Sequence, residues 1–209
     1  MSRYTVGITG ASGTIYAQKL ILDLLNLNHD IDLIISKAGL IVAFEELGWQ
    51  VPEEEIEATL YFNELFKALA LEEDGTQVDN FGHIRYFRFD HIAAAPASGS
   101  YIPDGMVIIP CSMGAASSVA SGKSDNLLER AADVTLKERR RMVMVPRETP
   151  MHAIHLRNLL TLAEAGVYVV PACPSFYQHP ETIDDLVRYF SLRVLDQLGI
   201  HCDSDQRWN

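Results

Sequence analysis

Three short loops in the 209-residue chain combine small, hydroxyl and charged side chains that could bind a phosphorylated ligand. The first, residues 9–13 (TGASG), follows an apolar run. Its small residues would let backbone amides approach a phosphate at the positive end of the next helix, and Ser12 adds a hydroxyl. The loop lacks the full GxGxxG fingerprint, and the next apolar run ends at Ser36 rather than at an acidic residue that would bind a ribose. A mononucleotide therefore fits better than NAD, with a plain tight turn as the alternative.

The second loop, residues 110–115 (PCSMGA), follows the apolar run MVIIP and opens a helix of very small residues. Small side chains would let a flat ring lie against the backbone. Close packing of this helix on the sheet is the alternative. Cys111 is more typical of a buried small hydrophobe than of a nucleophile.

The third loop, residues 145–150 (VPRETP), holds an Arg-Glu pair between two prolines, directly after another apolar run. Arg147 could bind a phosphate or the edge of a flavin with two hydrogen bonds. Glu148 beside it could transfer a proton. A surface ion pair is the alternative interpretation.

Further cations lie outside these loops. Arg130 and Lys137 are seven residues apart on one predicted helix and so share a face. The arginine run 139–141 at the end of that helix is interpreted as solvated and as complementing the helix dipole. His152 and His155 have helical i, i+3 spacing but no nearby third ligand, so no metal site is expected.

Composition narrows the class of protein. A net charge of −11 argues against nucleic-acid or anionic-membrane binding, which needs a broad basic face. No apolar run approaches the ~20 residues that span a bilayer, and the amino terminus runs into a strand without the features of a signal peptide. The three cysteines are sparse and unpatterned, as expected in a reducing cytoplasm.

The apolar pattern alternates strands and helices along the chain. Continuous apolar runs predict buried strands, and i, i+3, i+4 spacing predicts a final helix at 183–198, with its apolar stripe running from Ile183 to Leu198. A helix at 61–71, an extended segment at 83–89 and a loop at 93–100 are also expected. The predicted strands lie at residues 4–9, 31–35, 106–110, 142–145 and 167–170. These elements predict a single α/β domain over residues 1–209, a doubly wound parallel sheet with ligands at the carboxyl ends of its strands.

At the level of motifs, the chain resembles the UbiX-type flavin prenyltransferases. The resemblance covers nearly the whole sequence, but residues 47–95 match poorly. The matching segments are GITGASGTIY, SKAG, PASGS, PCSMGAASSVASGKSDNLLERAADVTLKERR, VPRETPMHAIHL and PACPSFY, together with Arg193 and Trp208.

This resemblance implies a Rossmann-like (flavodoxin-like) fold and a homo-oligomer, typically a dodecamer, with active sites where subunits meet. It implies transfer of a dimethylallyl group from dimethylallyl monophosphate to N5 and C6 of reduced FMN. The product, prenylated FMN, would serve a UbiD-type decarboxylase in ubiquinone or aromatic-acid metabolism.

Individual roles follow by resemblance at matching positions. Ser12 and Glu148 resemble the proton-handling pair, and Trp208 resembles a carboxy-terminal aromatic over the active site. The residues resembling FMN contacts are Gly10, Ala11, Ser12, Ser36, Ser112, Met113, Gly114, Ala115 and Arg147. The residues resembling the group around the substrate phosphate are Glu46, Ser98, Arg130, Lys137, Tyr177 and Arg193.

The residue chemistry agrees, because an allylic monophosphate leaves readily only when several cations neutralise it. The sequence offers no metal-ligand cluster but four such cations, so metal-independent transfer is expected. The four are Arg130, Lys137, Arg147 and Arg193. Two alternatives stay open: a flavin-dependent decarboxylase acting on aromatic acids or cysteine-type substrates, and a silent FMN-binding subunit. The cysteine-decarboxylase relatives use a Pro-x-Met-Asn motif, whereas here Pro146 is followed by Arg147 and Glu148.

Overall fold

The computed structural model describes residues 2–74 and 80–202, which fold around one six-stranded sheet in the order β3-β2-β1-β4-β5-β6. Every neighbouring pair of strands is parallel, as predicted for a doubly wound α/β fold. The strands are β1 (Arg3–Ile8), β2 (Asp30–Ile35), β3 (Ile84–Arg88), β4 (Gly105–Cys111), β5 (Arg141–Pro146) and β6 (Tyr168–Val169). The helices are α1 (Thr14–Asn26), α2 (Lys37–Leu47), α3 (Glu55–Asp74), α4 (Met113–Ala120), α5 (Leu127–Lys137), α6 (Ala153–Glu164), α7 (Ile183–Leu198) and the short 3-10 helix η1 (Ala95–Ala97).

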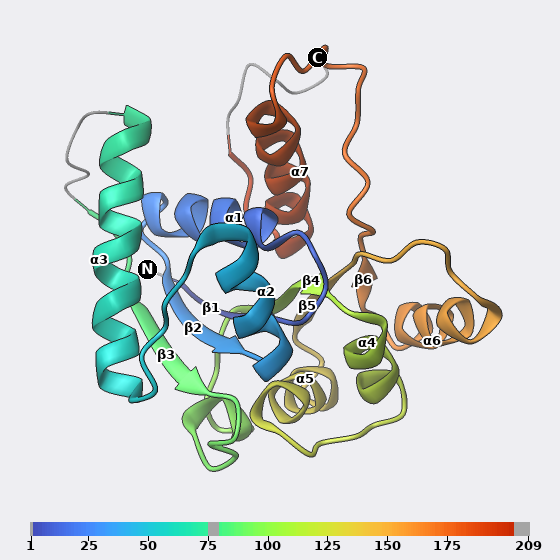
Figure 1. Ribbon diagram of the computed structural model, residues 1–209. Helices are drawn as coiled ribbons and strands as arrows, with labels where there is room; N and C mark the ends of the chain where they lie inside the picture. Colours follow the sequence, from blue (N-terminus) through green and yellow to red (C-terminus); the bar gives the residue numbers. More distant parts are fainter. Residues whose placement is uncertain (1, 75–79, 203–209) are drawn as a thin grey trace.

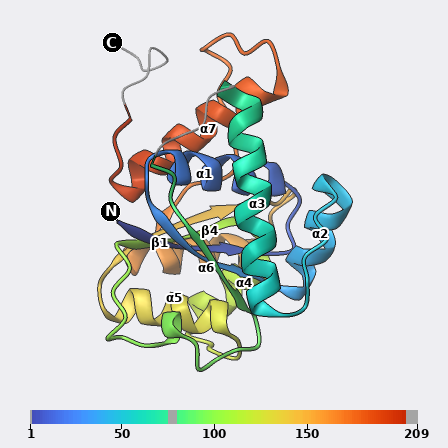
Figure 2. The same ribbon diagram turned by 90° about the vertical axis from the view of Figure 1, so that its left-hand side faces the viewer.

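Helices cover both faces of the sheet (Figures 1 and 2). α1, α3 and α7 pack on one face and α4, α5 and α6 on the other, while α2 lies at the edge where the strands end. Alternate residues of each central strand enter the two cores. In β4, Val107 and Ile109 join the first core, and Met106 and Ile108 join the second. Strands buried on both faces explain why the sequence reads as continuous apolar runs.

Two serines fix the starts of helices at the carboxyl ends of strands. The Ser36 hydroxyl accepts a hydrogen bond from the Gly39 amide at 3.0 Å and so caps the start of α2. The Ser112 hydroxyl accepts from the Ala115 amide at 3.3 Å and begins α4. The final helix spans Ile183–Leu198 as predicted.

Two local predictions, the fully buried strand at 167–170 and the apolar stripe starting at Ile183, were wrong. Only Tyr168 and Val169 pair with β5, and Tyr168 is 42% exposed because β6 is an edge strand. Ile183 is 72% exposed, since the buried residues of α7 begin only at Val187. The predicted loop at 93–100 is confirmed, and it includes the three-residue turn of η1.

Two of the three arginines after α5, Arg140 and Arg141, are bound to backbone, whereas Arg139 is exposed as predicted. Arg140 donates to the carbonyls of Gly99 and Tyr101, and Arg141 donates to that of Gln197. Carbonyl oxygens brought close by the fold, rather than the helix dipole, fix these two side chains. Among the described helices, none is long and apolar enough to cross a bilayer.

Candidate active site

The loops after β1 and β4 are locked together at the carboxyl edge of the sheet. The Thr9 hydroxyl donates to the Pro110 carbonyl at 2.8 Å and accepts from the Ser112 amide at 2.7 Å. The Thr9 amide also donates to the Pro110 carbonyl, at 3.2 Å. Thr9 is 2% exposed, so these bonds are shielded from water. Folding therefore fixes Ser12 and Ser112 on neighbouring loops of one surface.

Arg147 ties the loop after β5 to the same surface. Its amide donates to the Cys111 carbonyl at 3.2 Å, and its Nε donates to the Ser12 carbonyl at 3.0 Å. Within the described part of the chain, no hydrogen bond engages its two terminal nitrogens. Arg147 and Glu148 are both half-buried. The guanidinium is thus held from one side and can present its outer edge to an anion.

Glu46 occupies the amino terminus of α1. Its carboxylate accepts hydrogen bonds from the Gly13 amide at 3.0 Å and from the Thr14 amide at 2.7 Å. Burial acts to raise the pKa of Glu46, but hydrogen bonds from the Ser12 hydroxyl and from the Thr14 and Gly13 amides outweigh it and lower the pKa. The sequence predicted that the backbone amides at the start of α1 would bind a phosphate. In the structure, the amides of Gly13 and Thr14 instead donate to the Glu46 carboxylate.

The amino termini of α2 and α4 offer other amides at this edge, because the first turn of a helix leaves its N–H groups without intrahelical partners. The β1 loop approaches α2 closely, since a Cβ on Gly10 would lie 2.5 Å from the Cβ of Ala38. Above α4 the space is open: the nearest heavy atom to a Cβ on Gly114 would be the Ser112 hydroxyl at 4.0 Å. Bare backbone, two helix termini and Arg147 together suit a phosphorylated ligand with a flat ring.

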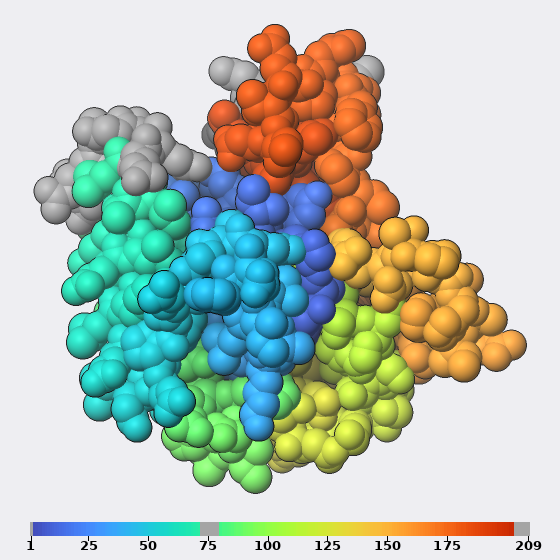
Figure 3. Space-filling view, in the orientation of Figure 1, coloured from blue at the N-terminus to red at the C-terminus, as the bar shows by residue number. Residues whose placement is uncertain are grey.

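Figure 3 views the molecule toward this edge, where α2 and the loop after β1 lie near the centre and α4 lies beside them. A hollow of about 300 Å³ adjoins the start of α2 at the ends of β2 and β3. It is lined by Ile35, Lys37, Leu40, Val51, Pro52, Glu53, Tyr86, Arg88, Phe89 and Asp90.

Ser98 and Lys137 lie at the opposite, amino edge of the sheet. The chain returns through residues 98–101 to the start of β4, and α5 runs antiparallel to the strands, so that Lys137 ends close to Gly99. A seven-residue strand such as β4 spans about 20 Å, and this is roughly the distance between the two edges. Within one chain, Ser98 and Lys137 do not join Ser12 and Arg147.

The remaining candidate cations lie on helices, Arg130 half-buried and Arg193 exposed. Arg130 pairs with Asp133 on α5 at 3.1 Å, and Arg193 pairs with Asp196 on α7 at 3.2 Å. Tyr177 lies in the segment before α7 and is 59% exposed. Trp208 falls outside the described residues.

The two histidines lie together at the start of α6. His152 caps α6 by accepting from the His155 amide at 3.4 Å, and the two rings lie with their centroids 3.5 Å apart. No group of three or more potential metal ligands is present in the described residues.

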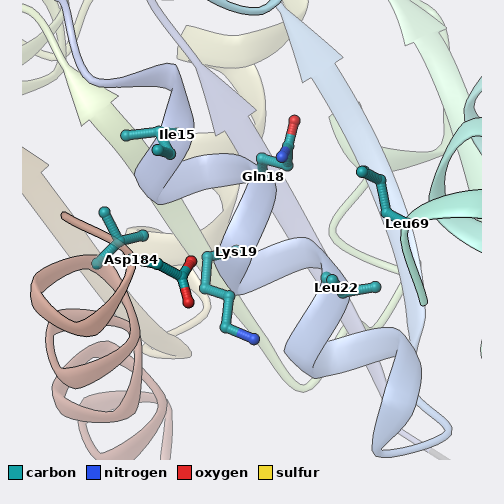
Figure 4. Close-up of a pocket in the computed structure, with 7 residues that line it drawn as sticks. Ile15, Gln18, Lys19, Leu22, Leu69 and Asp184 are labelled. Carbon is teal, nitrogen blue, oxygen red and sulfur yellow. The ribbon is translucent and has the colours of Figure 1, made fainter. Parts of the chain in front are cut away.

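A second hollow, of about 280 Å³, lies between α1, α3 and α7. Figure 4 shows Lys19 of α1 and Asp184 of α7 at one end of it, with Leu22 and Leu69 further along. Lys19 forms an ion pair with Asp23 at 3.0 Å. None of the described lining residues is among those singled out from the sequence.

Sequence reasoning missed the structural part played by Thr9. Thr9 and Pro110 are 101 residues apart, so no local spacing links them. The one available signal was that Thr9 and Pro110 both stand directly at the ends of predicted strands, which meet at one edge of a parallel sheet.

Comparison with known proteins gives, among others, a matching family model, a similar curated protein and two similar solved structures. The family model described as Flavoprotein matches residues 1–194. The flavin prenyltransferase UbiX of Halalkalibacterium halodurans is 45% identical over 205 residues, which are 98% of this chain and 92% of that protein. A crystal structure of AnUbiX (PadA1) with FMN and dimethylallyl pyrophosphate superposes with a TM-score of 0.81 at 34% identity, covering 100% of this chain and 97% of that one. A dodecameric FMN-dependent UbiX-like decarboxylase from Escherichia coli O157:H7 gives a TM-score of 0.80 at 36% identity, covering 99% and 98%.

Proposed function

The chain belongs to the flavoprotein family and, within it, to the UbiX-type flavin prenyltransferases, and on that premise we propose that it transfers a dimethylallyl group from dimethylallyl monophosphate to reduced FMN. The observation that carries the proposal is the surface at the carboxyl edge, where Arg147 is bound to the Ser12 carbonyl beside the open first turn of α4. This surface combines an anion-binding group with bare backbone against which a flat ring can lie.

The flavin would be held by the three loops and by α2. The amides at the starts of α2 and α4 would bind its phosphate, and the exposed backbone of Gly114 would contact its ring. Met113 would contribute through its backbone, because its side chain is only 5% exposed. The full set proposed to contact FMN is Gly10, Ala11, Ser12, Ser36, Ser112, Met113, Gly114, Ala115 and Arg147.

The prenyl donor would be bound by residues from more than one copy of the chain. Ser98 and Lys137 lie about one strand length from Ser12, so a second copy must supply them. The dodecameric structural relative supports a homo-oligomer. Large apolar side chains that are more than half exposed also support it; they include Ile154, Leu156, Leu160, Phe176, Tyr177 and Ile183.

In the reaction, the bond between the allylic carbon and the phosphate oxygen breaks, and the electron pair leaves with the phosphate. Arg130, Lys137 and Arg193 would neutralise the growing negative charge, so that protein cations do the work that a metal ion does elsewhere. Reduced flavin, when bound, supplies nucleophilic positions at N5 and C6. Ser12 and Glu148 would handle the protons: the proton released at N5 would pass to the prenyl double bond as the second bond forms, and Glu148 would accept the proton lost from C6. Trp208 remains proposed as the aromatic residue over the site.

The product would pass to a UbiD-type decarboxylase, and a reducing cytoplasm is the proposed location. The sparse, unpatterned cysteines of the sequence support this location.

The deciding experiment is to incubate the protein with reduced FMN and dimethylallyl monophosphate and to record the mass and absorption spectrum of the recovered flavin. We expect a flavin heavier by one prenyl unit, formed equally well with EDTA. Release of carbon dioxide from an aromatic acid by this protein alone, with the flavin mass unchanged, would favour the decarboxylase alternative. Loss of turnover in EDTA with recovery in magnesium would refute metal independence alone.

A further inference from the structure

The loop of residues 98–101 (SGSY), here called the serine loop, is gripped through its backbone by Arg140. The Arg140 Nη1 donates to the Tyr101 carbonyl at 2.7 Å, and its Nη2 donates to the Gly99 carbonyl at 2.6 Å. The planar guanidinium presents two donors in a fixed fork, a geometry that a lysine ammonium does not offer. Arg140 therefore fixes the carbonyls that lie either side of Ser100.

The Tyr101 side chain grips the same loop from the sheet. Its hydroxyl donates to the Asp32 carboxylate at 2.7 Å and accepts from Arg3 at 3.0 Å and from Arg85 at 2.9 Å. Asp32 is 1% exposed and stands in the middle of β2, so the network is anchored in the sheet itself. The serine loop is thus held from two directions by four charged side chains.

The last turn of α5 lies directly against the held loop. A Cβ on Gly99 would lie 3.3 Å from the Lys137 Nζ and 2.5 Å from the Glu138 Oε1, so only glycine fits here without displacing these groups. In the same loop the Ser98 and Ser100 hydroxyls are 2.9 Å apart. Lys137, which pairs with the Glu138 carboxylate at 3.3 Å, therefore lies against Gly99 in the same loop as the two hydroxyls, at the amino edge of the sheet.

We propose that Arg140 and Tyr101 are positioning residues, which hold the Ser98 hydroxyl beside Lys137 so that the pair binds the phosphate of the prenyl donor. This inference rests on the proposed function. Both side chains that would touch the phosphate are exposed, and exposed groups bind an anion weakly unless they are ordered beforehand. Arg140 supplies that order and not charge, because both of its terminal nitrogens are engaged by carbonyls.

The test uses the full-length assembled protein and measures KM for dimethylallyl monophosphate, kcat and FMN affinity separately. Arg140→Ala should raise KM about tenfold, with kcat and FMN affinity within about twofold, because donor binding is weakened while the flavin surface is untouched. Arg140→Lys should give an intermediate KM, since one ammonium cannot span both carbonyls. Tyr101→Phe should also raise KM, by about threefold.

The matched control is Arg139→Gln, which removes a charge at the adjacent exposed residue and should leave KM within about twofold. Tyr101→Phe keeps both Arg140 bonds to the backbone, so it decides the question if Arg140→Ala fails to assemble. Unchanged KM in Tyr101→Phe and the Arg140 variants, or equal effects of Arg139→Gln and Arg140→Ala, would overturn the positioning role.

A readout without turnover separates this inference from the proposed function. Binding of inorganic phosphate, followed by phosphorus NMR, should weaken by a similar factor in Arg140→Ala. If phosphate binding depends on Arg140 but the wild-type protein makes no prenylated flavin, the proposed function is contradicted and the positioning role is retained. If the protein prenylates FMN but phosphate binding is the same in Arg140→Ala, the positioning role is contradicted and the proposed function is retained.

Discussion

The loops at the carboxyl edge of the sheet and the helices α5 and α7 carry their candidate residues in different ways. At the carboxyl edge, each group is tied to another loop: the Ser112 amide donates to the Thr9 hydroxyl, and the Arg147 Nε donates to the Ser12 carbonyl. The cations proposed for the prenyl donor instead pair with acidic neighbours along their own helices. The pairs are Arg130–Asp133 at 3.1 Å, Lys137–Glu138 at 3.3 Å and Arg193–Asp196 at 3.2 Å.

This difference shows which side chains of the site are already held in place once a single chain has folded. The carboxyl-edge bonds join segments over 100 residues apart and exist once the sheet has formed. The pairs on α5 and α7 involve cations whose side chains are 42–65% exposed, and such pairs contribute about 0–1 kcal/mol. An incoming phosphate can therefore replace the acidic partner at little cost. We infer that the flavin surface belongs to one chain and that the donor surface is completed by a second.

The strongest test of this comparison is complementation between two inactive variants. Ser12→Ala removes the carboxyl-edge hydroxyl and Lys137→Ala removes the amino-edge ammonium, and each should lower turnover by about a hundredfold or more. After joint dissociation and reassembly, random mixing should restore about a quarter of the wild-type activity, because that share of sites combines two intact halves. Mixed oligomers seen by native mass spectrometry with no recovered activity would break the comparison and place the whole site in one chain.

Much of the fold could be predicted because the sheet is buried on both faces. Runs such as MVIIP and MVMV are apolar without interruption, and turn residues or helices bound them, so strand position and parallel order followed. Prediction failed where an element meets solvent. Tyr168 and Ile183 are apolar residues in apolar patterns, but both are exposed in this chain. Hydrophobic periodicity cannot distinguish a side chain buried in the core from one that contacts another copy of the chain.

The loops of the site could be predicted as loops, but not the bonds between them. Glu46 is 33 residues from Gly13 in the sequence. It caps α1 only because the fold places α2 beside the loop after β1. Arg140 read as part of a charged run, because nothing local indicates that the Gly99 and Tyr101 carbonyls converge on it. Such contacts arise from tertiary packing and carry no sequence period.

Adding one methyl group at the carboxyl edge gives the next largest effect. In Gly10→Ala the new Cβ would lie 2.5 Å from the Cβ of Ala38, forcing the β1 loop and α2 apart. Overpacking of this kind costs about 1–3 kcal/mol, and we expect the free energy of unfolding and FMN affinity to fall together. Urea titration and flavin fluorescence measure the two effects.

Gly114→Ala is the matched control, because the nearest heavy atom to the new Cβ is 4.0 Å away. Within α4 alanine is favoured over glycine by up to about 1 kcal/mol, so stability should hold or rise while FMN affinity falls. Unchanged FMN affinity in this variant would move the flavin ring away from α4.

Arg130→Gln tests whether a half-buried cation on α5 contributes to donor binding rather than to folding. Breaking its pair with Asp133 should change the free energy of unfolding by less than about 0.5 kcal/mol. The KM for dimethylallyl monophosphate should still rise about tenfold, because a charge-assisted bond to phosphate is lost. Urea unfolding and steady-state kinetics test the pair of expectations, and a loss of stability with unchanged KM would assign Arg130 to folding instead.

The smallest effect concerns Glu46, whose carboxylate belongs to the folded architecture of one chain. Glu46→Gln keeps the shape but removes the charge that accepts the Gly13 and Thr14 amides, and should cost about 1 kcal/mol at neutral pH, discounted for the exposure of the residue. Hydrogen bonding outweighs burial and lowers the pKa of Glu46, so its contribution is complete above the unfolded value of about 4.3. That contribution is lost as the pH falls through the lower folded value. Urea unfolding at fixed protein concentration should therefore show the gap in the free energy of unfolding between wild type and Glu46→Gln closing between about pH 5 and 3. The neighbouring exposed Glu45→Gln is the control, with a small gap that stays nearly constant. A gap for Glu46→Gln that widens in acid would mean that the charged carboxylate does not stabilise the start of α1.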